Sequence, residues 1–261
     1  MKAPLLNVQA VSKRFGGLAA LTDVHLQVQQ GQIYGLIGPN GAGKTTFFNV
    51  ITGLYQPDSG RFELNGRPYE PSSVHQVAQA GIARTFQNIR LFAEMTVLEN
   101  VMVGRHVRTH GWSSGVLGAL FQTRGYRNME AQIAEQAHGW LRYVGIDQTA
   151  HQLARTLSYG DQRRLEIARA LATEPKLLAL DEPAAGMNAT EKNGLRELLL
   201  RIQADGRTLL LIEHDVKLIM GLCDQVTVLD YGRVIAQGTP SVVQKDPAVV
   251  EAYLGTQVSH V

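Results

Sequence analysis

The sequence predicts an α/β fold with a mainly parallel sheet, an antiparallel β region near the N-terminus and a helical region inserted into the core. Three patterns carry this prediction. Short apolar runs alternate with helical segments, as expected when helices join parallel strands. Val24, Leu26 and Val28 alternate with polar neighbours, which is typical of a half-buried strand. Between about residues 84 and 157, apolar residues recur at three- and four-residue spacing, which favours helices.

Turn and stop signals bound most of the expected elements. Pro175 ends one helix, and Asn65-Gly66 predicts a hairpin after residues 61–64. A second hairpin crosses Tyr231-Gly232-Arg233 and precedes a short helical tail. Buried strands are expected at Ile33–Ile37, 177–180 and Thr208–Ile212, and helices at 45–52, 129–144, 162–173 and 195–202.

These elements predict a single domain, residues 1–261, whose core is discontinuous in sequence. Residues 1–84 and 160–240 form the core with its β region. Residues 85–159 form the helical region, with an insertion near 106–127, and residues 241–261 form the tail.

Composition excludes some classes of function. The formal net charge is +2 over 261 residues, so a dedicated nucleic-acid binder with a strongly basic face is not expected. The single cysteine, Cys223, cannot form an internal disulfide, which fits a reducing compartment. No segment approaches the roughly 18 apolar residues of a membrane helix, and the N-terminus has no signal-peptide core. We therefore expect a chain that does not span a membrane but can lie against one.

A glycine-rich loop joins the strand Ile33–Ile37 to the next helix. It matches the P-loop pattern in spacing and in context. Its glycines let backbone N–H groups converge on a phosphate chain, and the helix N-terminus favours the same anion. The loop therefore predicts a P-loop NTPase that binds ATP with Mg²⁺; the alternative is an ordinary glycine-rich turn. The residues expected to bind the nucleotide are Gly38, Pro39, Asn40, Gly41, Ala42, Gly43, Lys44, Thr45 and Thr46. Among these, Lys44 would contact the β- and γ-phosphates and Thr45 would hold Mg²⁺.

Two acids, Asp181 and Glu182, end the apolar run 177–180. The carboxyl ends of parallel strands are where nucleotides bind. Asp181 would hold Mg²⁺, and Glu182 would orient and polarise the attacking water. In-line phosphoryl transfer requires both roles. The alternative is that the two acids only cap the next helix.

A second glycine motif, Leu157-Ser158-Tyr159-Gly160-Asp161-Gln162, precedes the helix 162–173. Ser158 suits a helix N-cap, and Gly160 permits a close approach of the backbone to a ligand. Placed between the P-loop and the acid pair, this motif resembles the signature of the ATP-binding-cassette ATPases. The resemblance covers nearly the whole chain. It implies that two cassettes stack head to tail, so that Ser158, Gly160 and Gln162 act in trans on the partner's ATP.

The same resemblance assigns roles to further residues. Phe15 would stack on adenine, and Gln87 would sense Mg²⁺ and the membrane partner. His214 would be the switch histidine, and residues 185–188 would cross the dimer interface. Taken alone, Phe15 is compatible with core packing, Gln87 with a surface amide and His214 with a satisfied histidine at a strand end.

Finer matches resemble the LivG subfamily, one of two ATPase subunits of bacterial branched-chain amino-acid importers. They lie at residues 15–21, 81–92, 96–101 and 250–255, and the insertion 106–127 is also similar. One departure is Ala189 after Asn188, where a proline is expected, and it bears on the path of that loop.

This subfamily implies a peripheral protein at the cytoplasmic face of the inner membrane. Its partners would be two transmembrane permease subunits and a LivF-like ATPase or a second copy of the chain. An extracytoplasmic solute-binding protein would act through the permeases. Related importers carry urea, short amides or other amino acids. Two other functions stay open: the ATPase of a lipid or lipopolysaccharide exporter, and a non-transport cassette ATPase acting on ribosomes or DNA.

Two surface features are candidates for partner contact. The apolar residues Ile89, Leu91 and Phe92 would contact the permease or pack in the core. Four arginines would face the membrane side or acidic permease loops, or form a solvated basic face. They are Arg84, Arg90, Arg105 and Arg108.

Overall fold

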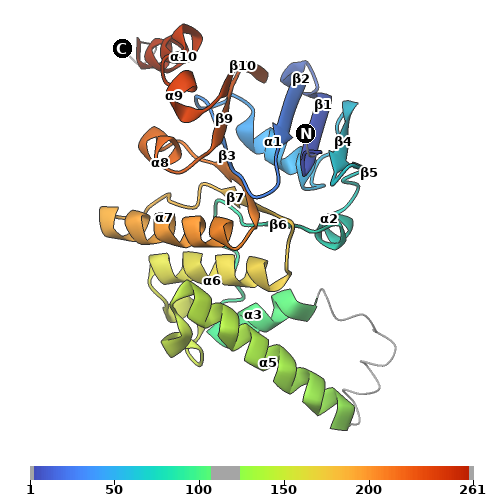
Figure 1. Ribbon diagram of the computed structural model, residues 1–261, viewed down its shortest axis with the longest axis vertical. Helices are drawn as coiled ribbons and strands as arrows, with labels where there is room; N and C mark the ends of the chain where they lie inside the picture. The colour runs from blue at the N-terminus through green and yellow to red at the C-terminus, as the bar shows by residue number, and fades with distance from the viewer. Residues whose placement is uncertain (1–2, 107–123, 259–261) are drawn as a thin grey trace. The chain divides into compact units, whose positions relative to one another are not determined.

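The chain folds into two compact units in a computed structural model, which describes residues 3–106 and 124–258 (Figure 1). One unit comprises residues 1–87 and 176–261, and the other comprises residues 88–175. The expected α/β class, with an antiparallel β region and inserted helices, is confirmed.

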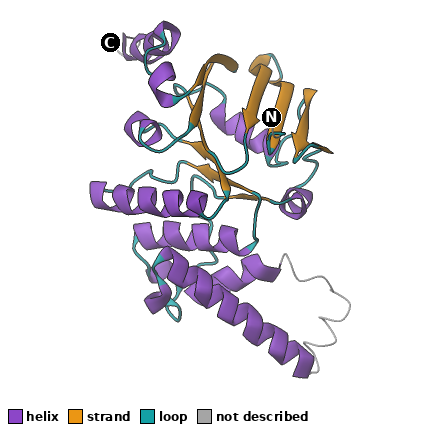
Figure 2. Ribbon diagram, in the orientation of Figure 1, coloured by secondary structure: helices purple, strands orange, loops and turns teal. Residues whose placement is uncertain are grey.

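The first unit holds two sheets (Figure 2). The antiparallel sheet has the strand order β2-β1-β4-β5, and the six-stranded sheet has the order β10-β9-β3-β8-β7-β6. All neighbours in the second sheet are parallel except β9 and β10. The bounds are β1 Leu6–Phe15, β2 Leu18–Val28, β3 Ile33–Ile37, β4 Ser59–Leu64, β5 Arg67–Tyr69, β6 Ile82–Arg84, β7 Leu177–Asp181, β8 Thr208–Ile212, β9 Gln225–Asp230 and β10 Arg233–Gly238.

One hydrophobic core contains residues from both sheets and from α1 (Lys44–Ile51). Phe47 and Phe48 of α1 are fully buried, and every residue of β3, β7 and β8 is buried. Continuous apolar runs form these strands because both faces of a central parallel sheet are covered. This packing fixes the ends of β3 and β7, where the predicted site residues lie.

The remaining helices of this unit are short, apart from α7 and α10. They are α2 Val74–Ala80, α7 Ala189–Ala204, α8 Val216–Met220, α9 Pro240–Val243 and α10 Pro247–Val258. Neither α2 nor β6 was predicted from the sequence. A three-residue strand has no period to detect, and β6 exists because Ile82 pairs in parallel with Leu177 of β7. None of the helices in the described ranges is long and apolar enough to cross a membrane.

The second unit is helical. It contains α3 (Val97–His106), α5 (Arg124–Val144) and α6 (Tyr159–Ala172), which contact one another, and two short 3-10 turns. From the sequence, α6 was expected to belong to the ATPase core from residue 160 onward, but in the structure it belongs to the helical unit. The reason is its packing against α3 and α5, since an apolar helix face does not reveal which neighbour will cover it. Of the predicted insertion 106–127, residues 107–123 lie outside the described ranges.

Candidate active site

The phosphate loop runs from the end of β3 into α1, as the sequence predicted. Gly43 has φ 100°, and a Cβ there would lie 2.6 Å from the carbonyl oxygen of Ala20 on β2. Only glycine fits this close approach. Gly41 also has positive φ, 80°, but a Cβ there would meet nothing within 4 Å. The loop is therefore packed against β2 at Gly43 and open at Gly41.

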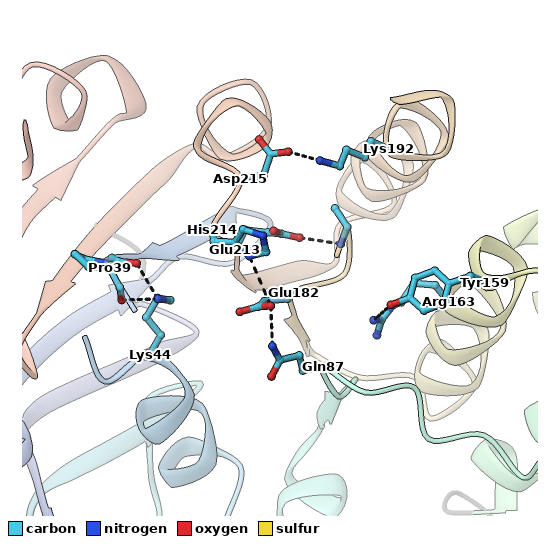
Figure 3. Close-up of polar contacts among 12 residues, drawn as sticks. Pro39, Lys44, Gln87, Tyr159, Arg163, Glu182, Lys192, Glu213, His214 and Asp215 are labelled. Atoms are coloured by element: carbon cyan, nitrogen blue, oxygen red, sulfur yellow. Dashed lines mark hydrogen bonds and ion pairs between the residues drawn. The ribbon is translucent and has the colours of Figure 1, made fainter. Parts of the chain in front are cut away.

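Lys44, the first residue of α1, reaches back over the loop. Its Nζ donates hydrogen bonds to the carbonyl oxygens of Gly38 at 2.8 Å and Pro39 at 2.9 Å (Figure 3). Only 7% of the residue is exposed. Burial lowers the pKa of Lys44, while the charges of Glu182 and Asp181 raise it. The lysine thus lies within the field of both predicted site acids, and a phosphate would replace the two carbonyls as its partner.

The two acids at the end of β7 have different surroundings. Asp181 is 2% exposed, and its Oδ2 accepts a hydrogen bond of 2.8 Å from Nη2 of Arg84. Glu182 turns out of the strand with φ 47°, a conformation that costs a residue with a Cβ about 1–2 kcal/mol. Strain of this kind collects at functional sites because the surrounding structure imposes it.

Glu182 is the centre of a small polar cluster. Its Oε2 accepts a hydrogen bond of 2.9 Å from Nε2 of Gln87 and lies 3.6 Å from Nδ1 of His214 (Figure 3). The Glu182 side chain is 17% exposed, whereas that of His214 is 57% exposed. Three residues that are far apart in sequence are therefore brought together at one edge of the six-stranded sheet.

Other predicted nucleotide residues lie at the surface. Thr45 is exposed at the start of α1, and Thr46 is half-buried. Phe15 ends β1 with 43% of its surface exposed, in edge contact with the Tyr55 ring at 5.2 Å. Lys13 Nζ lies 5.5 Å from the centre of the Phe15 ring. Phe15 is thus not part of the core, which leaves its ring accessible.

The signature residues belong to the helical unit. Ser158 caps α6: its hydroxyl accepts from the backbone N–H of Asp161 at 3.2 Å and donates to the Asp161 carboxylate at 2.9 Å. Gly160 is buried, and Gln162 Nε2 donates to the carbonyl of Leu157 at 3.0 Å. These bonds fix the first turn of α6, so the motif is a rigid helix start.

The loop after Glu182 leads directly into α7. Asn188 caps this helix in a capping box with Glu191. Ala189 is the first helical residue, a position where proline is also favoured. The departure from the family pattern therefore falls where alanine and proline both suit the start of the helix.

Sequence reasoning missed two site residues. Arg84 was expected on a basic surface, but its side chain is 9% exposed and paired with Asp181, so that expectation is wrong. Glu213, before His214, is 1% exposed, and its Oε1 accepts from the backbone N–H of Ala184 at 2.8 Å (Figure 3). Its Oε2 has no hydrogen-bond partner among the described residues. The only sequence pattern that could have indicated Arg84 or Glu213 as a site residue was a charged residue directly after a buried apolar run.

The other surface candidates are mixed. Ile89 and Leu91 are half-buried, and Phe92 is 46% exposed with the Arg169 guanidinium 5.7 Å from its ring centre. Arg90 is exposed. Arg105 forms an ion pair of 2.8 Å with Glu174, and Arg108 lies outside the described residues.

Comparison with known proteins agrees with this geometry. The family model of the ABC transporter matches residues 21–185, and that of the branched-chain amino acid ATP-binding cassette transporter matches residues 233–259. The chain is 44% identical to the high-affinity branched-chain amino acid transport ATP-binding protein BraF of Pseudomonas aeruginosa, covering 98% of this chain and 99% of the relative. It is equally similar, over the same coverage, to the high-affinity branched-chain amino acid transport ATP-binding protein LivG of Escherichia coli K12.

Solved structures give the same result. A nucleotide-free ATP-binding cassette from an ABC transporter superposes with a TM-score of 0.83 at 33% identity, covering 96% of this chain and 98% of that one. The ADP conformation of an ATP-binding cassette has the same score and identity, with 97% and 99% covered. The chain belongs to the ATP-binding cassette family of ABC transporters.

Proposed function

We propose that this chain is the ATP-hydrolysing subunit of an importer for branched-chain or related amino acids. The observation that carries the proposal is the cluster around Glu182. A P-loop lysine, a buried aspartate and a glutamate held by Gln87 and His214 meet at the carboxyl ends of β3, β7 and β8. The names of the similar proteins supply the transported class, which the cassette itself does not select.

The P-loop would hold ATP. Residues 38–46 would present backbone N–H groups and the start of α1 to the phosphates, and Lys44 would add a full charge. The exposed ring of Phe15 would stack on the adenine. The open side of the loop at Gly41 supports this assignment, because a ligand needs backbone that no side chain covers.

The chain's oxygen donors fit Mg²⁺. Asp181 and the Thr45 hydroxyl would hold the ion, with Gln87 beside them, and carboxylate and hydroxyl oxygens suit this hard cation. The part of the chain that the structure describes has no group of three or more His, Cys, Asp or Glu that could bind a metal alone. Mg²⁺ sites of this kind are completed by substrate phosphates. When bound, the ion would neutralise phosphate charge.

Glu182 would orient and polarise the attacking water, and His214 would contact the γ-phosphate side of the site. The hydrogen bond from Gln87 and the imidazole 3.6 Å away would hold the carboxylate in position for that water. Ser158, Gly160 and Gln162 would complete the site of a second cassette in trans, because the N-terminus of α6 favours an anion. Hydrolysis would therefore require two cassettes.

The proposed assembly contains two permease subunits, a second ATPase that is LivF-like or another copy, and an extracytoplasmic solute-binding protein acting through the permeases. The chain would lie at the cytoplasmic face of the inner membrane. We further propose that the core, the inserted helices and the tail together form one cassette.

Reconstitution tests this function. The chain is co-expressed with two candidate permease subunits and a second ATPase, the complex is placed in vesicles with a candidate solute-binding protein, and ATP-dependent uptake of radiolabelled leucine is measured. Uptake that disappears with Glu182→Gln is the expected result. A complex that hydrolyses ATP but moves lipid outward would support an exporter instead, and tight binding to ribosomes without any permease would support the non-transport alternative.

A further inference from the structure

Arg84 is a buried cation at the end of β6 with partners on two other elements. Its Nη2 donates to Asp181 Oδ2 on β7 at 2.8 Å. Its Nη1 donates to Asn49 Oδ1 at 2.7 Å and to Thr52 Oγ1 at 2.9 Å, at the last turn of α1. One guanidinium therefore bridges the phosphate-loop helix and the strand that ends in the acid pair.

Two aromatic rings keep this guanidinium in place. Its central carbon lies 5.5 Å from the centre of the Phe48 ring and 5.0 Å from that of Phe86. Cation–π contacts at such distances stabilise a partly desolvated arginine. The Arg84 and Asp181 side chains are 9% and 3% exposed. A buried guanidinium with a polar partner on each side and rings around it has little freedom to rotate.

We propose that Arg84 is a positioning residue, which orients the Asp181 carboxylate for Mg²⁺ and couples it to the helix that begins with Lys44 and Thr45. The inference rests on the proposed function, since it concerns the metal of the same site. Arg84 acts through Asp181, and the P-loop contacts to the nucleotide do not involve it. Groups that orient a metal ligand in this way contribute about 10- to 100-fold to metal affinity.

The geometry, rather than the charge alone, carries this role. A planar guanidinium donates in two directions at once, whereas a lysine ammonium is a single point donor on a flexible stem. Arg84→Lys keeps the positive charge beside Asp181 but cannot span Asn49, Thr52 and Asp181 together. We therefore expect Arg84→Lys to weaken Mg²⁺ binding as much as Arg84→Gln does. The Gln variant should weaken Mg²⁺ binding even though it removes a positive charge that competes with Mg²⁺ for Asp181.

The test is a titration of the full-length chain with a fluorescent, non-hydrolysable ATP analogue, first in EDTA and then at increasing Mg²⁺. In both Arg84 variants, the Mg²⁺ concentration at half-saturation should rise about 10- to 100-fold, while the affinity in EDTA stays unchanged. Arg67→Gln is the matched control, because Arg67 is an exposed arginine on β5 of the same unit. It should behave as the wild type.

Three results would overturn the inference: an unchanged or tighter Mg²⁺ response in Arg84→Gln, an equal loss in EDTA, or a wild-type response in Arg84→Lys. If the Arg84 variants do not fold, Asn49→Ala removes one anchor of the guanidinium and should shift the Mg²⁺ response roughly 2- to 10-fold. No shift there would also overturn it. A wild-type chain that binds no analogue, or binds it without any Mg²⁺ dependence, would contradict the proposed function instead.

Discussion

The backbone conformation of Glu182 makes a prediction about stability that is separate from the role of its side chain in activity. Its φ of 47° is strained for any residue with a Cβ. Glu182→Ala and Glu182→Gly remove the same carboxylate and the same contacts, so they differ only in the Cβ. Alanine at this φ costs about 1–2 kcal/mol, and glycine loses about 0.4–1 kcal/mol through its freer unfolded chain. Glu182→Gly should therefore be the more stable of the two by about 0.5–1 kcal/mol.

Urea unfolding of the full-length chain without nucleotide measures this difference, provided that the slope m is the same for both variants. The matched control is Glu197, an exposed residue inside α7. In a helix interior the order is reversed. The free energy of unfolding of Glu197→Ala should therefore be higher than that of Glu197→Gly by about 1 kcal/mol. If alanine is also the more stable residue at position 182, the backbone there is not held at positive φ and the reasoning fails.

Activity should follow the carboxylate and not the stability. Glu182→Gln, Glu182→Ala and Glu182→Gly should all bind ATP and should all lose hydrolysis by a factor on the order of 10²–10⁴, the usual contribution of a general base. Glu182→Gln should accumulate an ATP-bound dimer, seen by size-exclusion chromatography. A variant that hydrolyses ATP at the normal rate would remove Glu182 from its proposed role.

Three further predictions concern other parts of the site. Lys44→Ala should abolish nucleotide binding, because it removes the positive charge that would contact the β- and γ-phosphates. An unchanged affinity in a titration would contradict the P-loop assignment. Gly43→Ala should lower the free energy of unfolding by clearly more than Gly41→Ala. Both changes add strain of about 1–2 kcal/mol at positive φ, but only the first places a Cβ 2.6 Å from a backbone oxygen; equal losses in urea unfolding would refute this. Burial raises the pKa of Glu213, partly offset by its bond to the Ala184 N–H. The stability that Glu213 contributes to the folded chain should therefore be lost as the pH rises from about 4.3, the usual glutamate value, through the raised pKa. Between these two pH values, the free energy of unfolding of Glu213→Gln should increase relative to that of the wild type. Parallel stability–pH curves for the two proteins would contradict this prediction.

Much of the fold was predictable because its signals are local. Apolar runs marked β3, β7 and β8, and the glycine spacing marked the phosphate loop together with the chemistry of Lys44. The acid pair was visible because two charges at the end of an apolar strand need a cation. Each of these depends on residues within a few positions of one another.

The sequence by itself therefore determined the α/β class, the phosphate loop and the acids of the site. Tertiary structure alone decided that Arg84 pairs with Asp181, 97 residues away, instead of facing a surface. It also decided that α6 packs with the helical unit and that Glu182 is held at positive φ. The physical reason is the same in each case. A helix face, a buried charge or a strained turn is specified by the neighbour that covers or compensates it, and no local spacing identifies a neighbour far away in the chain.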